Sequence, residues 1–177
     1  MKNIKMPCFV GFNYEGLDNA GDHIQSIATE KLLPGISARY NRDSIGLANT
    51  NIKSYLIMNG WFSHTPETCL PISPNIIPIF WGFHISNYNN GWDYFSQNKT
   101  IDYFKKYEPI GCRDPYTAYR LSKLGVHTFV SKCLTLTLPI RKEKPKDNLI
   151  IIVDGDKVSQ PNTLPINKDK VFLPEYI

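Results

Sequence analysis

Short apolar runs separated by polar, glycine-containing segments recur along the first two thirds of the chain. Runs of this length that end at turn residues predict buried β-strands. Two of them end at glycine turns, around Gly60 and Gly82. The five predicted strands are residues 7–12 (PCFVGF), 54–60 (SYLIMNG), 75–86 (NIIPIFWGFHIS), 109–113 (PIGCR) and 127–131 (HTFVS).

Apolar residues at helical spacing predict helices between these strands. The first covers residues 23–33 (HIQSIATEKLL), with Asp22 at the expected N-cap and Pro34-Gly35 as the stop. Its predicted core face consists of Ile24, Ile27, Ala28 and Leu32. A shorter amphipathic helix is predicted over residues 100–108.

The helix predicted over residues 114–126 (DPYTAYRLSKLGV) has the clearest ends. Asp114 is its N-cap, Pro115 occupies the first helical position, where a missing N–H is harmless, and Gly125 closes it. Strands that alternate with helices in this way predict an α/β fold, with a mostly parallel, Rossmann-like sheet and helices on both faces.

Residues 1–140 form the predicted Rossmann-like N-terminal domain. The charged, proline-containing segment 141–148 (RKEKPKDN) is the predicted linker. Residues 149–177 begin with a strongly apolar run and are expected to be the start of a truncated second domain, or an edge segment added to the first sheet.

The formal net charge is +4, and the basic residues are scattered along the sequence. This mild excess suits small anions and argues against a nucleic-acid partner, which needs a clustered basic face. Four widely spaced cysteines fit reduced thiols in a cytoplasmic protein and predict neither a metal site nor a disulfide framework. No apolar stretch is as long as a membrane span.

Candidate chemistry lies in the loops after the strands, because α/β sheets bind ligands at the carboxyl ends of their strands. Asn19, Gly21 and Asp22 precede a helix whose free N–H groups attract anions. The alternative is structural, with Asp22 as a cap and Gly21 in a tight turn. Gly60 and Gly82 lie in two further post-strand loops and are candidate binding positions.

Two side chains beyond the later strands carry more specific chemistry. His84 follows an apolar strand and is a candidate acid or base, although packing is an alternative. Arg113 stands at a strand end, where its guanidinium suits a carboxylate or phosphate. The alternative for Arg113 is an internal salt bridge that fixes its loop.

Five segments in this order resemble the polysaccharide pyruvyl transferase family. They are NAGDHIQSIA, which contains the Asn-x-Gly-Asp loop, then LIMNGWF, PIFWGFHIS, GCRDPYTAYRLSKLGV and SKCLTLTLP. The resemblance extends over roughly residues 7 to 155. It rests on the ordered set of segments, since no single motif is specific.

The resemblance implies the first half of a two-domain GT-B-type fold. It implies transfer of a pyruvyl group from phosphoenolpyruvate to a sugar of a surface polysaccharide, with catalytic His84 and Asp22. Substrate-binding residues would be Arg113, Asn19, Gly21, Gly60 and Gly82. No cofactor is expected beyond this donor, and the acceptor would be a sugar or lipid-linked saccharide, which leaves open a peripheral membrane location. The alternatives are a GT-B-type glycosyltransferase and a non-catalytic remnant or binding module.

Overall fold

The computed structural model describes residues 7–14, 19–86, 90–140 and 142. The chain divides into a compact unit, Met1–Leu138, and a second unit, Pro139–Ile177. Apart from Lys142, the predicted linker and the apolar run after it lie outside the described residues. Within the described part, no helix has the length and apolar character needed to cross a membrane.

The first unit is built on a six-stranded sheet in the order β2-β1-β3-β4-β5-β6. Every neighbouring pair of strands is parallel, which confirms the predicted α/β architecture. The strands are β1 (Phe9–Asn13), β2 (Ala38–Asn41), β3 (Ser54–Trp61), β4 (Ile76–His84), β5 (Ile110–Cys112) and β6 (Thr128–Val130).

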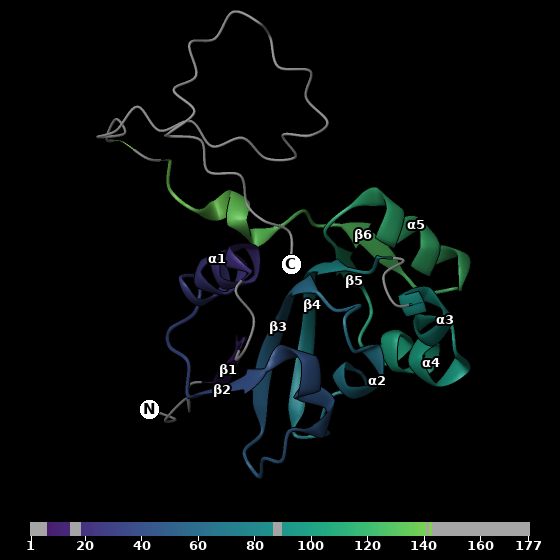
Figure 1. The fold of residues 1–177 in the computed structure, drawn as a ribbon, viewed down its shortest axis with the longest axis horizontal. Helices are drawn as coiled ribbons and strands as arrows, with labels where there is room; N and C mark the ends of the chain where they lie inside the picture. The colour runs from purple at the N-terminus through teal and green to yellow at the C-terminus, as the bar shows by residue number, and fades with distance from the viewer. Residues whose placement is uncertain (1–6, 15–18, 87–89, 141, 143–177) are drawn as a thin grey trace, which may run out of the picture. The chain divides into compact units, whose positions relative to one another are not determined.

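The helices divide between the two faces of this sheet. The connection from β1 to β2 runs toward one edge of the sheet, and the connections from β3 to β6 run toward the other edge. Because crossovers between parallel strands are right-handed, α1 lies on the face opposite the later helices. Figure 1 shows α1 on one side of the strands and α2 to α5 on the other. The helices are α1 (Ala20–Glu30), η1 (Arg42–Leu47), α2 (Pro66–Cys69), α3 (Gly91–Phe95), α4 (Asn98–Lys106), α5 (Pro115–Lys123) and η3 (Leu134–Thr137).

The main core lies between the sheet and α2 to α5. The ring of Phe83 packs edge to face with those of Phe80, Phe95 and Phe104, which come from β4, α3 and α4. Because side chains alternate along a strand, the intervening residues of β4 face the other way, and Trp81 is 41% exposed there. The side of the sheet that carries α1 is therefore less completely covered.

Helix α1 differs from its prediction. It begins at Ala20, and its N-cap is Asn19, whose side-chain oxygen accepts from the N–H of Gly21, so the N-cap prediction for Asp22 is wrong. The predicted apolar face is right for Ala28, which is buried, but wrong for Ile24, Ile27 and Leu32, which are about half exposed. The polar residues Asp22 and Thr29 are buried in their place. The helix turns this way because its partners on the sheet are polar.

One of these partners is Asn59, a buried residue of β3. Its amide nitrogen donates to the carbonyl of Gln25 and to the hydroxyl of Thr29, both on α1, and its oxygen accepts from the N–H of Leu134 at the start of η3. A single side chain thus connects α1, β3 and η3. Gly82 makes room for it, because a Cβ at this position would overlap Asn59 Oδ1, and its φ of +77° also favours glycine.

Replacing Gly82 by alanine is therefore expected to destabilise the protein by about 3 kcal/mol, through the left-handed backbone and the overlap with Asn59. The measurement is urea unfolding followed by tryptophan fluorescence. Gly35→Ala is the matched control, because among the described residues no atom outside its chain neighbours lies within 4 Å of the Cβ it would add. Equal unfolding midpoints for the two variants would contradict this account of Gly82.

Candidate functional site

All six strands end at the same edge of the sheet, because all are parallel. The direction of chain progression reverses between β1 and β3, which marks the switch point where open α/β sheets bind ligands. Two groups of polar side chains occupy this edge. One lies at the ends of β1, β2 and β3, and the other at the ends of β4 and β5.

The first group is centred on Arg42, whose side chain is only 2% exposed. Its Nη1 lies 2.7 Å from Oδ2 of Asp22 on α1, and its Nε donates to Oδ1 of Asp43 at 2.8 Å. The guanidinium also lies over the rings of Tyr14 and Trp61, with 5.3 and 5.7 Å to their centroids. The buried positive charge is thus held between two carboxylates and two aromatic rings.

The electrostatics of this group keep Arg42 and Asp43 ionised. Burial opposes the charge of Arg42, but the Asp43 hydrogen bond and the two carboxylates outweigh it and raise the pKa of Arg42. Burial likewise opposes the charge of Asp43, but Arg42, together with His64, lowers the pKa of Asp43. His64 Nδ1 lies 3.1 Å from Asp43 Oδ2, and its ring stacks on Trp61.

The second group is centred on His84, the last residue of β4. Its Nδ1 lies 2.6 Å from Oδ2 of Asp114, the N-cap of α5. Asp114 Oδ1 accepts from the backbone N–H of Thr117 at 2.8 Å, which confirms the predicted cap. The Thr117 hydroxyl donates to Asp114 Oδ2 and accepts from the N–H of Ile85, so α5 is joined directly to the end of β4.

These hydrogen bonds determine the tautomer of the His84 imidazole. Burial opposes ionisation of Asp114, but hydrogen bonds from Thr117 and His84 outweigh it and lower the pKa of the carboxyl, so Asp114 accepts and Nδ1 of His84 carries the proton. Burial and the nearby charge of Arg113 outweigh Asp114 and lower the pKa of His84 below 6.5. At neutral pH the ring is therefore neutral, with a lone pair on Nε2.

Arg113 follows β5 and is close enough to His84 to affect its titration. Its backbone N–H donates to the carbonyl of Phe83, which fixes the main chain beside β4. Over residues 7–14, 19–86 and 90–140, its side chain has no ion pair and no hydrogen bond. The predicted internal salt bridge is therefore not found among the described residues, and the guanidinium can bind an external anion.

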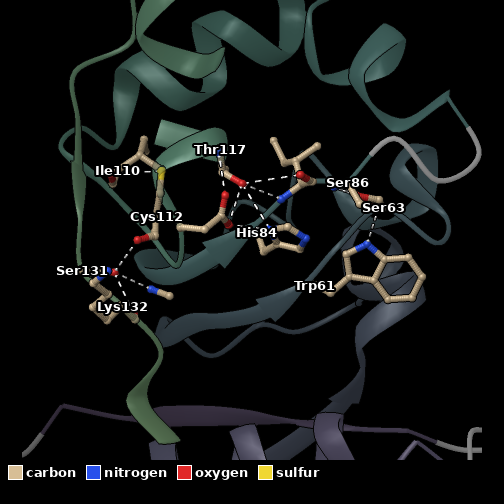
Figure 2. A network of polar contacts seen from close by, with 12 residues as sticks. Trp61, Ser63, His84, Ser86, Ile110, Cys112, Thr117, Ser131 and Lys132 are labelled. Carbon is tan, nitrogen blue, oxygen red and sulfur yellow. Dashed lines mark hydrogen bonds and ion pairs between the residues drawn. The ribbon is translucent and has the colours of Figure 1, made fainter. Parts of the chain in front are cut away.

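Further hydrogen bonds connect the strand ends on either side of His84 (Figure 2). The indole N–H of Trp61 donates to Ser86, and the N–H of Ser86 donates to Ser63. On the other side, the hydroxyl of Ser131 accepts from the N–H of Gly82 and donates to the carbonyl of Cys112. The ends of β3 to β6 are thus held together by polar contacts.

The structure brings some predicted site residues together and separates others. Arg113 lies beside His84, whereas Asp22 lies in the other group. Asp22 is on α1, which follows β1, and β3 lies between β1 and β4. Since neighbouring strands are about 4.8 Å apart, β1 is about 10 Å from β4. Asn19 and Gly21 are exposed at the start of α1. Gly60 is buried, with Gln25 of α1 3.3 Å from where its Cβ would lie. Its place, like that of Gly82, is explained by packing.

Sequence reasoning missed Arg42, Asp43 and His64 as site residues. The adjacent Arg42-Asp43 pair was a usable signal, since it follows a short strand as Arg113-Asp114 does. That strand, β2, was itself missed. Within the described ranges no three of the His, Cys, Asp and Glu side chains gather in a way that could hold a metal ion.

The family model for polysaccharide pyruvyl transferase matches residues 19–175. This match covers most of the chain, so the protein belongs to the polysaccharide pyruvyl transferase family. No curated protein and no solved structure matches the chain. The α/β sheet with its two groups of polar residues is therefore the structural frame of a member of this family.

Replacing Arg42 by alanine is expected to destabilise the protein by about 3–5 kcal/mol, because Asp22 would remain buried without its counter-charge. Urea unfolding measures the change. Arg39→Ala removes the same charge from an exposed pair with Glu30 and should cost less than about 1 kcal/mol. Similar losses for the two variants would contradict the structural role of Arg42.

The pKa of His84 in the folded protein is expected below 6.5 and should rise in Arg113→Gln, because the variant removes a positive charge that disfavours the imidazolium. NMR titration of the imidazole nitrogens measures both values. The matched control is Arg39→Gln, which removes a charge elsewhere on the surface. An unchanged pKa in Arg113→Gln would show that the guanidinium does not act on His84.

Proposed function

We propose that the protein acts in pyruvyl transfer from phosphoenolpyruvate to a sugar of a surface polysaccharide, as half of a GT-B-type site. Family membership supports the reaction class. The observation that carries the proposal is that two groups lie next to each other at the carboxyl edge of the sheet. They are the Arg113 guanidinium, which has no partner among the described residues, and the neutral, oriented imidazole of His84. The guanidinium can bind the anionic donor, and the imidazole can take the proton of a hydroxyl acceptor.

Arg113 is the proposed donor contact. Phosphoenolpyruvate carries a phosphate and a carboxylate, and the planar guanidinium can bind either with two parallel hydrogen bonds. The N-terminus of α1 is less suited to this role than the sequence suggested. Its first N–H groups are already used, since Gly21 donates to the side chain of Asn19 and Asp22 to the Asn19 carbonyl.

His84 is the proposed acid or base. In the first step an acceptor hydroxyl adds to C2 of the donor, His84 Nε2 takes the hydroxyl proton, and a proton is delivered to C3. In the second step another hydroxyl of the sugar attacks C2 and loses its proton, and phosphate leaves from C2. The products are the pyruvyl ketal and inorganic phosphate. Asp114 keeps the proton on Nδ1 and so leaves Nε2 available.

Asp22 enters this proposal as a supporting residue. Its carboxylate is buried and paired with Arg42, so it holds the end of β2 against the first turn of α1. The reaction uses no cofactor beyond its donor. A cytoplasmic location fits the free thiols of Cys8 and Cys133, neither of which is buried.

Arg113→Ala is expected to weaken phosphoenolpyruvate binding by about 10- to 100-fold, because charge-assisted hydrogen bonds to the donor are lost. Isothermal titration calorimetry on the full chain measures the affinity. His84→Gln should retain phosphoenolpyruvate binding, since the side chain of His84 moves a proton and does not hold the donor. The same variant should lose transfer, measured by phosphate release.

Arg39→Ala is the control for a general effect of removing one positive charge, and its affinity should equal that of the unaltered protein. Equal donor affinity in Arg113→Ala would overturn the role of Arg113. Binding of a nucleotide sugar in place of phosphoenolpyruvate would instead identify a glycosyltransferase. The absence of heat with both donors would identify a non-catalytic member of the family.

A further inference from the structure

The positive charge of the chain is concentrated in two helices. Helices α4 and α5 contain five basic residues against one acid, Asp102. Their formal charge is therefore +4, equal to that of the whole chain, and everything outside them is formally neutral. Although basic residues are scattered along the sequence, the excess of positive over negative charge therefore lies on these two helices.

Helix α5 carries this charge together with aromatic side chains on one stripe. Tyr116, Tyr119, Arg120 and Lys123 have the i, i+3, i+4, i+7 spacing that aligns residues along one helix face. The buried residues Thr117, Ala118 and Leu121 form the opposite face. Tyr116 is 46% exposed and Tyr119 59%, so two large rings face the solvent on the same stripe as two cations.

Contacts within the stripe hold its cations beside the rings. The Arg120 guanidinium lies 4.5 Å from the Trp92 ring centroid and donates to the Tyr116 hydroxyl at 2.9 Å. Lys123 lies 5.3 Å from the Tyr119 ring centroid. Stacking of this kind orders the side chains before any partner binds, which lowers the entropy cost of binding.

The C-terminal end of α4 extends the same surface. A Cβ on Gly125, just beyond α5, would lie 3.7 Å from Nζ of Lys105, so the two helix ends are neighbours. Lys105 and Lys106 are both exposed. Figure 1 shows α3, α4 and α5 together on the side of the sheet opposite α1. We call Lys105, Lys106, Tyr116, Tyr119, Arg120 and Lys123 the α4–α5 surface.

We propose that the α4–α5 surface binds the anionic headgroups of a phospholipid membrane. Lysine and arginine beside a membrane are attracted by its negative surface potential, and tyrosine rings partition into the interfacial layer. The exposed tyrosines favour lipid over nucleic acid, because amphipathic rings of this kind sit at the level of the headgroups. The partner is therefore a lipid surface, recognised by charge and by aromatic insertion.

The α4–α5 surface lies close to the candidate acid or base. Asp114, the N-cap of α5, contacts His84, and Tyr116 follows two residues later, so the stripe starts within one turn of the candidate acid or base. Membrane binding would bring a lipid-carried saccharide close to that group. This last link rests on the proposed transfer reaction, whereas membrane binding does not.

The test is co-sedimentation of the full chain with vesicles of phosphatidylcholine containing about 30% phosphatidylglycerol, in the absence of any substrate. The double variant Lys105→Gln, Lys123→Gln should partition about 25-fold more weakly, since each basic residue near such a surface contributes about fivefold. The matched control is Lys31→Gln, Lys53→Gln, which removes two exposed charges from other parts of the fold. Tyr119→Ser should weaken binding at unchanged charge.

Binding that is lost in pure phosphatidylcholine vesicles and at high salt would support the proposal. It would be overturned by equal partitioning of the two double variants, by no sedimentation of the unaltered chain, or by binding to a DNA duplex in place of vesicles. Because no substrate is present, failure here leaves the proposed transfer standing, and loss of transfer leaves vesicle binding unaffected.

Discussion

The carboxyl edge of the sheet depends on the charge of Arg42 being neutralised inside the protein. An isolated guanidinium out of water would cost several kcal/mol, and Asp22 and Asp43 remove most of that cost. These contacts join the first turn of α1, the end of β2 and the start of η1. Through Asp43 the same network reaches His64. The switch point of the fold is therefore shaped by an ion-pair network more than by apolar packing.

The sequence was sufficient for the parts of the fold that depend on local chemistry. The apolar runs located β1, β3, β4, β5 and β6, and the capping residues of α5 lie where they were expected. The short elements β2, α2 and α3 were missed, because four or five residues carry too little periodicity. The orientation of α1 was also wrong. A hydrophobic pattern cannot show that Asp22 and Thr29 face inward, since their partners Arg42 and Asn59 are distant in the sequence.

At the site, too, contacts that are local in the sequence were predicted, and contacts between distant residues were not. Asp114 was recognised as a helix cap, and it does cap α5. Its second contact, with His84, joins residues 30 positions apart and could come only from the pairing of β4 with β5. One carboxylate thus both starts a helix and fixes a tautomer. The adjacent Arg113 and Asp114 have separate tasks, because the guanidinium points to no partner in the described part of the chain while the carboxylate is fully engaged.

The less covered side of the sheet has a consequence for how the protein behaves in solution. Trp81 and Phe129 pack edge to face there, and both are more than a third exposed, as is Ile79. Salt acts on both sides, and both effects favour association. It screens the repulsion between the cationic helices within about 10 Å, and strongly hydrated salts strengthen the association of apolar surfaces. A strongly hydrated salt should therefore shift the molecules from mutual repulsion toward self-association through the exposed rings.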